Sequence, residues 1–150
     1  VHLYRKEHSA ALGSWQPRYI QHHFRDARFG LYDTAGEPWF GFDCVRELEG
    51  LPPELLIVPM VGHSPGHAAI AVDTGDGWIL HCGDSYFHRG EARPDEGPVP
   101  KGLKLFQTVI QDNGTARRRN QERLRQLAAD HKSEVTLFCA HDAVEFARYV

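Results

Sequence analysis

The pattern of hydrophobic and polar positions divides the chain into strands and helices. Three continuous apolar runs are typical of buried strands: residues 55–60, 68–72 and 134–140. Two segments repeat apolar positions at helical spacing, 103–110 and 120–131, and Thr115 is the expected N-cap of the second helix. Weaker patterns predict strands at 1–4, 39–42 and 45–48, and helical segments at 5–12, 18–27 and 143–149.

This order of elements predicts a fold in which helices pack on a largely buried sheet. Such layering is typical of the α/β and α+β classes. A length of 150 residues suits a single domain over 1–150 and is enough to bury a sizeable core. The residues 89–101, rich in glycine and proline, predict a long loop, and loops of this length often shape a pocket.

One predicted hairpin brings polar groups together. The sequence Thr-Gly-Asp-Gly at 74–77 predicts a tight turn between two apolar strands. If its two central residues form the loop, facing positions have numbers that sum to 151, as 74 and 77 do. His67 then lies opposite Asp84. The turn that runs from His63 to His67 should therefore lie at the same end of the hairpin as the Asp84 carboxylate.

Three candidate metal ligands, His63, Asp84 and His141, each follow a predicted strand. His141 joins the other two if its strand lies in the same sheet and ends at the same edge, which is a common place for sites in α/β folds. Two imidazoles and one carboxylate suit zinc, with iron or manganese as alternatives. A His-x-x-x-His turn and a Gly-Asp pair are also common structural features, so the spacing alone leaves both interpretations open.

Composition excludes several classes of function. A formal net charge of −3 argues against a strongly basic nucleic-acid binder. We expect the cluster 117–119, three consecutive arginines, to lie on a solvated helix face. No apolar run approaches the ~20 residues that a membrane-spanning helix needs. No secretory signal opens the sequence, although its first residue is Val1 and the natural start is expected upstream.

The cysteines favour a reducing, cytoplasmic location. Cys44, Cys82 and Cys139 form no Cys-x-x-Cys pair, and the last two lie in apolar runs. We expect buried, reduced thiols that behave as small hydrophobic side chains.

Three motifs resemble those of the metallo-β-lactamase superfamily. Residues 62–67, Gly-His-Ser-Pro-Gly-His, resemble its Gly-His-Thr-Pro-Gly-His motif. Residues 81–84 resemble its strand that ends in Gly-Asp, and residues 138–142 resemble its last metal motif, a strand that ends in His-Asp. The resemblance implies an αββα sandwich of two similar halves, of which this chain matches mainly the second.

The resemblance also implies roles for individual residues. His63 would bind a first metal, Asp84 would bridge two metals, and His141 would bind the second, while His67 would orient the turn. One or two zinc ions, with iron or manganese as alternatives, would activate water to cleave an ester, lactone, thioester or amide-type bond in a small-molecule substrate. A thioester hydrolase of the glyoxalase II type and an iron-dependent sulfur dioxygenase are further alternatives within the superfamily.

The sequence indicates residues that could contact a substrate less specifically than it indicates the metal ligands. Asp84 is a candidate catalytic residue through its metals, and Tyr86 is a second candidate, because a tyrosine one residue further on lies near the site in some lactonases of the superfamily. An ordinary half-buried tyrosine is the alternative. Family members insert substrate-contacting segments where this chain has a group of aromatic residues and histidines, for which packing is the alternative: Trp15, Tyr19, His22, His23 and Phe24.

One departure from the superfamily is large. Its leading motif, His-x-His-x-Asp-His, does not occur in these 150 residues. We therefore take the chain to be the C-terminal portion of such a protein, and we expect weak metal binding, an uncovered apolar sheet face and self-association into a homo-oligomer. The alternative is a non-catalytic truncated module that acts by self-association or by binding a partner.

Overall fold

The computed structural model describes residues 1–13 and 18–149 of the chain. Its main element is a six-stranded sheet of order β3-β4-β5-β6-β7-β8, in which only the β7–β8 pair is parallel. The strands are β3 (Glu37–Trp39), β4 (Phe42–Glu47), β5 (Leu55–Pro59), β6 (Ala68–Asp73), β7 (Trp78–His81) and β8 (Val135–Phe138). The mixed α/β fold expected from the sequence is confirmed.

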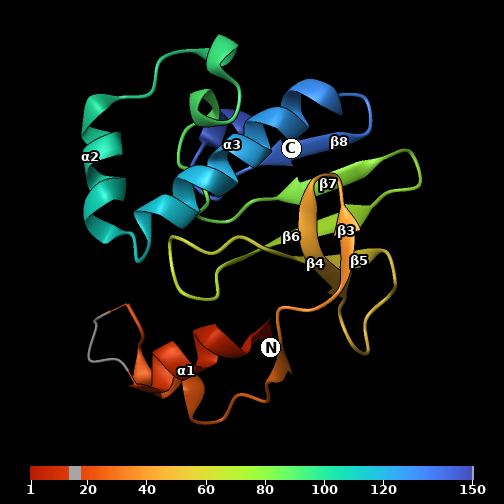
Figure 1. The fold of residues 1–150 in the computed structure, drawn as a ribbon, viewed down its shortest axis with the longest axis vertical. Helices are drawn as coiled ribbons and strands as arrows, with labels where there is room; N and C mark the ends of the chain where they lie inside the picture. The colour runs from red at the N-terminus through yellow and green to blue at the C-terminus, as the bar shows by residue number, and fades with distance from the viewer. Residues whose placement is uncertain (14–17, 150) are drawn as a thin grey trace.

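Helices flank this sheet and a small parallel sheet lies at one end of the molecule. Figure 1 shows α3 lying across the strands at the upper end and α1 at the lower end, near the N-terminus. The remaining elements are β1 (His2–Tyr4), α1 (Arg5–Gly13), η1 (Gln21–Phe24), β2 (Gly30–Tyr32), η2 (Arg89–Glu91), η3 (Pro94–Glu96), α2 (Lys101–Ile110), α3 (Gly114–Asp130) and α4 (Ala143–Phe146). The η elements are single 3₁₀ turns.

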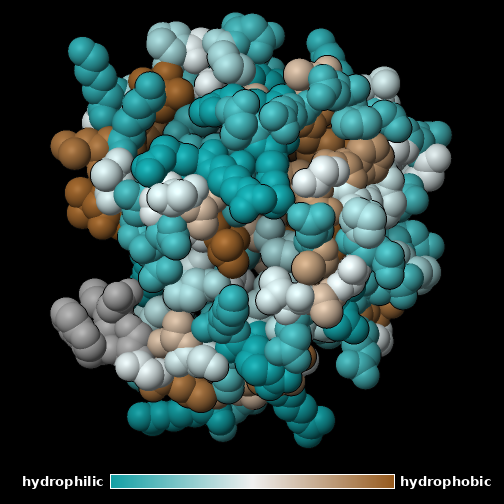
Figure 2. Space-filling model, in the orientation of Figure 1, coloured by the Kyte–Doolittle hydropathy of each residue, from teal (hydrophilic) through white to brown (hydrophobic). Residues whose placement is uncertain are grey.

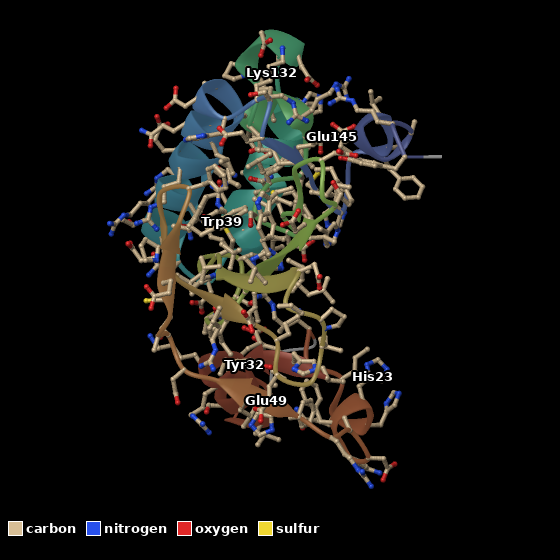
Figure 3. The ribbon with its side chains drawn as sticks, turned by 90° about the vertical axis from the view of Figure 1, so that its right-hand side faces the viewer. His23, Tyr32, Trp39, Glu49, Lys132 and Glu145 are labelled. Atoms are coloured by element: carbon tan, nitrogen blue, oxygen red, sulfur yellow. The ribbon has the colours of Figure 1, made fainter. Side chains whose placement is uncertain are left out.

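Strand β5 is buried on both faces, at Ile57 and Val58, which explains its continuously apolar sequence, whereas β6 and β7 are buried on one face and half-buried on the other. On one face, Leu124 and Leu127 of α3 pack in a cluster with Val58 of β5 and with side chains of β6, β7 and β8. On the other face, Ile57 packs with the small sheet through Tyr32. Figure 3 shows Tyr32 beside Glu49, whose backbone N–H donates a 2.8 Å hydrogen bond to the tyrosine hydroxyl.

Several exposed apolar side chains lie on α2. Leu105, Phe106 and Val109 are 68%, 54% and 74% exposed. Figure 2 shows brown side chains along the left edge of the molecule, on the side where Figure 1 places α2. Within the described part of the chain, no helix has the length and apolar character needed to cross a membrane.

Two local expectations are wrong. The helix predicted over 18–27 is reduced to the 3₁₀ turn Gln21–Phe24, in which no residue is buried. Helices gain most of their stability from burying one face, and this segment buries none. The N-cap of α3 is Asn113 and not Thr115, because the Asn113 side chain accepts the backbone N–H of Ala116 at 3.0 Å.

Candidate metal centre

The β6–β7 hairpin has the register expected from its turn. Ile70 pairs with His81 and Asp73 with Trp78, so facing numbers sum to 151. Continuing that register past the strands places His67 opposite Asp84, and the imidazole Nε2 of His67 accepts the backbone N–H of Asp84 at 2.9 Å. The prediction that the hairpin unites the histidine turn with Asp84 is confirmed.

His67 has no free nitrogen for a metal. Its Nε2 accepts the N–H of Asp84, and its Nδ1 lies 3.1 Å from the carbonyl oxygen of Met60, to which it donates. Burial lowers the pKa of His67, which favours the neutral imidazole that this pair of hydrogen bonds requires. The geometry therefore fits a residue that holds the turn in place.

Backbone contacts fix the position of His63. The carbonyl oxygen of His63 accepts the backbone N–H of Asp112 at 3.1 Å and a guanidinium N–H of Arg18 at 2.8 Å. The preceding Gly62 has φ +139°, and a Cβ there would lie 2.4 Å from the backbone nitrogen of Arg117. Only glycine lets the turn approach α3 so closely.

The parallel pairing of β7 with β8 brings in the third residue. His81 pairs with Phe138, so both strands end at the same edge of the sheet, and the backbone N–H of Ala140 donates to the carbonyl of Gly83 at 3.0 Å. Asp84 and His141 follow directly. The sheet edge predicted for them is confirmed.

The three predicted ligands meet at this edge. Nε2 of His141 lies 2.8 Å from Oδ1 of Asp84, and Nε2 of His63 lies 3.4 Å from Oδ2 of the same carboxylate. The side chains are 18% exposed for His63, 34% for Asp84 and 49% for His141, so the cluster opens towards solvent on the His141 side. Burial lowers the pKa of His63, while the charge of Asp84 opposes this shift.

The donor types in this cluster fit zinc, but their present geometry is one of direct contact. Two imidazole nitrogens and a carboxylate are ligands that zinc takes. Within residues 1–13 and 18–149, however, no three His, Cys, Asp or Glu side chains are spaced to hold a metal ion as they stand. Both imidazoles turn Nε2 directly onto Asp84. The juxtaposition is a finding, and the role of the three residues as metal ligands stays a prediction.

The ring of Phe87 packs beside the imidazoles of His63 and His141. Its ring centroid lies 4.2 Å from that of His141 and 6.1 Å from that of His63, and the residue is 5% exposed. Its backbone N–H donates to the carboxylate of Glu91 at 2.9 Å, which fixes the loop. The role of Phe87 could not be predicted from the sequence, because an apolar residue three places after Asp84 carries no signal of its own.

An apolar hollow of about 410 Å³ adjoins the cluster. His141 lines it together with Phe87, Leu103, Phe106 and Val144. Phe106 and Val144 are 54% and 51% exposed, although exposed apolar side chains gain nothing from contact with water. The arrangement can take up a non-polar group beside His141.

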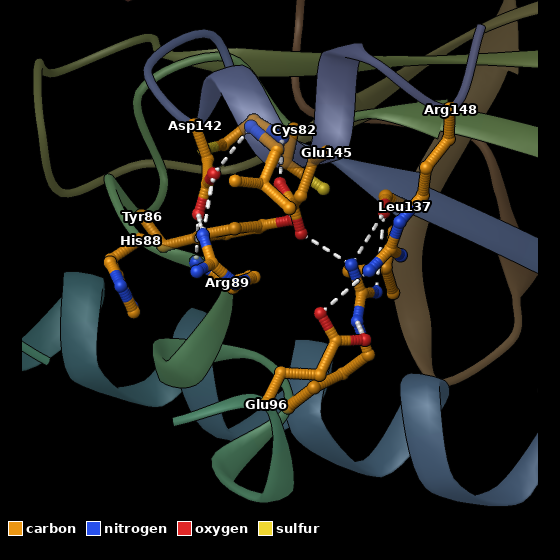
Figure 4. Close-up of polar contacts among 12 residues, drawn as sticks. Cys82, Tyr86, His88, Arg89, Glu96, Leu137, Asp142, Glu145 and Arg148 are labelled. Carbon is orange, nitrogen blue, oxygen red and sulfur yellow. Dashed lines mark hydrogen bonds and ion pairs between the residues drawn. The ribbon is translucent and has the colours of Figure 1, made fainter. Parts of the chain in front are cut away.

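Tyr86 does not reach the cluster. Its side chain is fully buried, and its hydroxyl lies 3.0 Å from both carboxylate oxygens of Glu145, to which it donates. Burial raises the pKa of Tyr86 well above its ordinary value, so the hydroxyl keeps its proton. The expectation that this hydroxyl points at the site is wrong, and Tyr86 serves the buried network that Figure 4 shows.

That network holds the chain on either side of His141. Glu145 accepts the backbone N–H of Cys139 at 2.9 Å and forms an ion pair with Arg93. Asp142 accepts the backbone N–H of Arg89 at 2.8 Å and pairs with its guanidinium (Figure 4). The strand end that carries His141 is thereby tied to the loop that follows Asp84.

The aromatic and histidine group near the N-terminus lies on other elements. His22 and His23 belong to the exposed turn η1 and pack against each other, with ring centroids 4.4 Å apart. The Tyr19 hydroxyl donates to Glu7 at 3.0 Å, and the same carboxylate accepts the backbone N–H of Gly66 at 2.7 Å. Trp15 lies outside the described residues.

Comparison with known proteins yields relatives in sequence and in fold. Two probable metallo-hydrolases, from Mycobacterium tuberculosis and Mycobacterium bovis, are each 39% identical to the chain over 107 residues, which are 71% of this chain and 34% of the relative. No family model matches the chain.

Solved structures share the fold at low sequence identity. A mutant of AiiA from B. thuringiensis, with N-decanoyl-L-homoserine bound at its active site, matches with a TM-score of 0.66 and 17% identity over 99% of this chain and 49% of that chain. The hydrolase AbOPH of the beta lactamase superfamily matches with a TM-score of 0.56 and 18% identity over 94% of this chain and 47% of that chain. The chain is thus related in sequence to metallo-hydrolases over part of their length, and it shares the metallo-β-lactamase fold.

The family resemblance read from the three motifs is therefore confirmed. This metallo-β-lactamase-fold chain spans about a third of the length of the curated relatives that it matches, and about half of the solved chains. The shared half of the fold includes the six-stranded sheet.

Proposed function

We propose that the chain contributes His63, Asp84 and His141 as metal ligands to the active site of a hydrolase that cleaves an ester, lactone, thioester or amide-type bond. The observation that carries this proposal is the convergence of two imidazoles on the two oxygens of one carboxylate, at 2.8 and 3.4 Å. Each imidazole faces its own oxygen, as a carboxylate between two cation positions requires. Zinc, with iron or manganese as alternatives, would supply a water of lowered pKa and polarise the scissile carbonyl.

The residues around the cluster would orient its ligands. His67 fixes the backbone of Asp84, Phe87 packs on the ring of His141, and Asp142 ties the neighbouring backbone to Arg89. Groups that orient metal ligands usually affect metal affinity as well. A bound ion would take the place of the direct contacts that Nε2 of His63 and Nε2 of His141 now make with Asp84.

Within this class, we favour a small ester or lactone with a non-polar substituent. The apolar hollow beside His141 supports a non-polar group next to the reacting bond. An N-acyl homoserine lactone hydrolase with the product N-hexanoyl-L-homoserine bound at its catalytic metal center matches the fold with a TM-score of 0.66 and 17% identity, over 99% of this chain and 49% of that chain. Two observations therefore support this class of substrate: the resemblance in fold to that hydrolase, and the apolar hollow of this chain.

Metal analysis of the purified 150-residue chain tests the ligand assignment. We expect zinc or iron to co-purify or to titrate into the chain, and we expect His63→Ala, Asp84→Ala and His141→Ala each to lower metal affinity about 10-fold or more. His23→Ala is the matched control, because it removes an imidazole from the exposed turn η1. Unchanged metal affinity in all three ligand variants would contradict the proposal.

A second candidate function is association without catalysis. Exposed Leu105 and Val109 on α2, and half-buried Val72 and Ile79 on the sheet face opposite α3, offer apolar surface to a second copy or another polypeptide. Sedimentation equilibrium of the chain tests this: a monomer at all concentrations that also binds metal would favour the hydrolase, whereas a metal-free dimer would favour association.

A further inference from the structure

A second hollow lies on the other side of α2 from the candidate metal centre. It has a volume of about 690 Å³ and lies between α2, α3 and the turns η2 and η3. Lys104 and Gln107 of α2 line it, whereas Leu103 and Phe106 of the same helix line the apolar hollow beside His141. Its volume is in the range of small-molecule sites in proteins, ~300–1,000 Å³.

Basic side chains dominate the lining of this hollow. Lys104, Arg117, Arg118 and Arg125 face two carboxylates, those of Glu91 and Glu122, which leaves an excess of two positive charges. Arg125 pairs with Glu122 at 2.8 Å. Among the described residues, Lys104 and Arg118 form no ion pair. The hollow therefore suits a ligand that carries two negative charges.

Arg117 is a half-buried cation held by neutral groups. Its Nε donates to the side-chain oxygen of Gln111 at 2.8 Å, and a terminal N–H donates to that of Gln107 at 2.6 Å. Burial lowers the pKa of Arg117, the charge of Glu91 opposes this shift, and the charge of Arg118 adds to it. A guanidinium has five N–H donors, so donors remain for an oxyanion, which would also offset the cost of burying the charge.

The one buried carboxylate in the lining, that of Glu91, forms hydrogen bonds but no ion pair with Arg117. Oε2 of Glu91 accepts the side-chain amide of Gln107 at 2.7 Å and the backbone N–H of Phe87 at 2.9 Å. Gln121 is 5% exposed and donates to the carbonyl of Ser85 at 3.0 Å. These bonds connect Glu91 to Arg117 through Gln107, whose side-chain oxygen accepts from the guanidinium, so Glu91 lies near Arg117 without pairing directly with it.

We propose that this hollow binds a small organic phosphate, with the phosphate group on Arg117, Arg118 and Lys104 and the non-polar part against Pro94 and Val99. A guanidinium matches the geometry of phosphate oxygens, and a phosphate dianion matches the excess charge. The arginine cluster 117–119, expected on a solvated face, thus divides: Arg117 and Arg118 line the hollow, and Arg119 does not. The proposal does not depend on metal binding at His63, Asp84 and His141.

Calorimetric titration of the 150-residue chain with phenylphosphonate, at low salt and about pH 8 where the phosphonate is a dianion, tests the proposal. Phenylphosphonate resists hydrolysis and carries a ring for Pro94 and Val99. We expect phenylphosphonate to bind saturably with 1:1 stoichiometry. We expect benzoate to bind at least about 10-fold more weakly, because a monocarboxylate carries one charge fewer. Absence of saturable phenylphosphonate binding, or equally tight binding of benzoate, would overturn the proposal.

Two charge-matched variants decide whether the hollow is the site. Arg118→Gln removes an exposed lining cation and is expected to weaken phenylphosphonate binding about 10-fold. Arg119→Gln removes the same charge one residue away, outside the lining, and is expected to change binding by less than about 2-fold. An Arg118→Gln effect that does not exceed the Arg119→Gln effect would show diffuse electrostatic attraction and would overturn the proposal. Circular dichroism of both variants confirms that the fold is kept.

Discussion

His67 and Asp84 are joined across the β6–β7 hairpin by a hydrogen bond in which the imidazole Nε2 accepts the backbone N–H at 2.9 Å. The bond needs Gly83 between the strand and the aspartate, because a Cβ at Gly83 would lie 2.7 Å from that same Nε2. Two residues 17 positions apart thereby fix the backbone from which the Asp84 side chain extends.

Replacement of His67 should destabilise the chain. His67→Ala leaves the N–H of Asp84 and the carbonyl of Met60 without their side-chain partner, which is expected to lower the free energy of unfolding by about 1–3 kcal/mol. Urea unfolding followed by circular dichroism measures the change. His22→Ala, in an exposed turn, should change stability by less than about 0.5 kcal/mol, and equal effects of the two variants would contradict the prediction.

The hairpin shows what the sequence could predict. The turn at 74–77 fixes the loop length, and the two-residue period of a strand then leaves one register that buries Leu80. The parallel β7–β8 pair joins two strands that lie far apart in the sequence, so it depends on the fold as a whole. The meeting of His63 with Asp84 could therefore be expected from local sequence, whereas that of His141 could be expected only on the condition that its strand lies in the same sheet.

Other parts of the site depend on packing that no local pattern records. Strand alternation cannot be extended from Asp84 to Tyr86, because Gly83 has φ +54° and the N–H of Ser85 turns back onto the carbonyl of Cys82. That turn sends the Tyr86 side chain into the core. The contact of Phe87 with His141 likewise depends on how the loop after β7 packs at the end of β8.

Tyr86→Phe separates a structural role from a catalytic one. The variant removes the hydroxyl that donates to Glu145. Arg93 and the N–H of Cys139 still bind the Glu145 carboxylate, so we expect the free energy of unfolding to fall by only about 1 kcal/mol. Metal affinity should not change. Glu145→Leu should cost about 3 kcal/mol or more, because it leaves Arg93 without its buried partner. A Tyr86→Phe chain with full stability and impaired metal binding would contradict this assignment.

Acid should weaken the fold partly through Asp142. Burial alone would raise the pKa of this carboxyl, but the N–H groups of Arg89 and Val144 and the Arg89 guanidinium hold it below its ordinary value of 3.8. A carboxyl whose pKa is lowered by folding stabilises the native state above its unfolded pKa, and this contribution is lost as the pH falls through the folded pKa. We therefore expect the free energy of unfolding to decline below about pH 4.

Asp142→Asn is the test of that contribution. The variant keeps the shape of the side chain but removes the titrating group, so it should be less stable at neutral pH and should show a smaller decline in acid. Unfolding in urea at several pH values measures both effects. Parallel stability curves for the two chains would show that Asp142 does not contribute to acid sensitivity.

The thiols should differ in reactivity. Burial raises the pKa of Cys139 to about 12 and raises that of Cys82 well above its ordinary value, and all three cysteines are free. The thiolate is the reactive form, so Cys82 and Cys139 should resist iodoacetamide at about pH 8 in the native chain. Cys44, which is only half-buried, is the internal reference. Mass spectrometry of labelled peptides measures the three rates, and the prediction is wrong if Cys139 is labelled as fast as Cys44.

The hollow beside His141 gives a prediction about substrate preference. Phe106 lines it and is 54% exposed, so Phe106→Ala removes apolar contact area for a bound substituent at little cost to the fold. If the proposed hydrolase activity holds, kcat/KM of the metal-loaded protein for a hexanoyl ester or lactone should fall about 10-fold through a higher KM, because burial of non-polar area contributes equally to ground state and transition state. The value for an acetyl ester, whose acyl group has less non-polar area to bury in the hollow, should stay within about 2-fold. Leu105→Ala is the matched control, since Leu105 is more exposed and lies outside the lining. If both variants reduce hexanoyl and acetyl turnover alike, the hollow does not select the substrate, while the assignment of the metal ligands would stand on its own test.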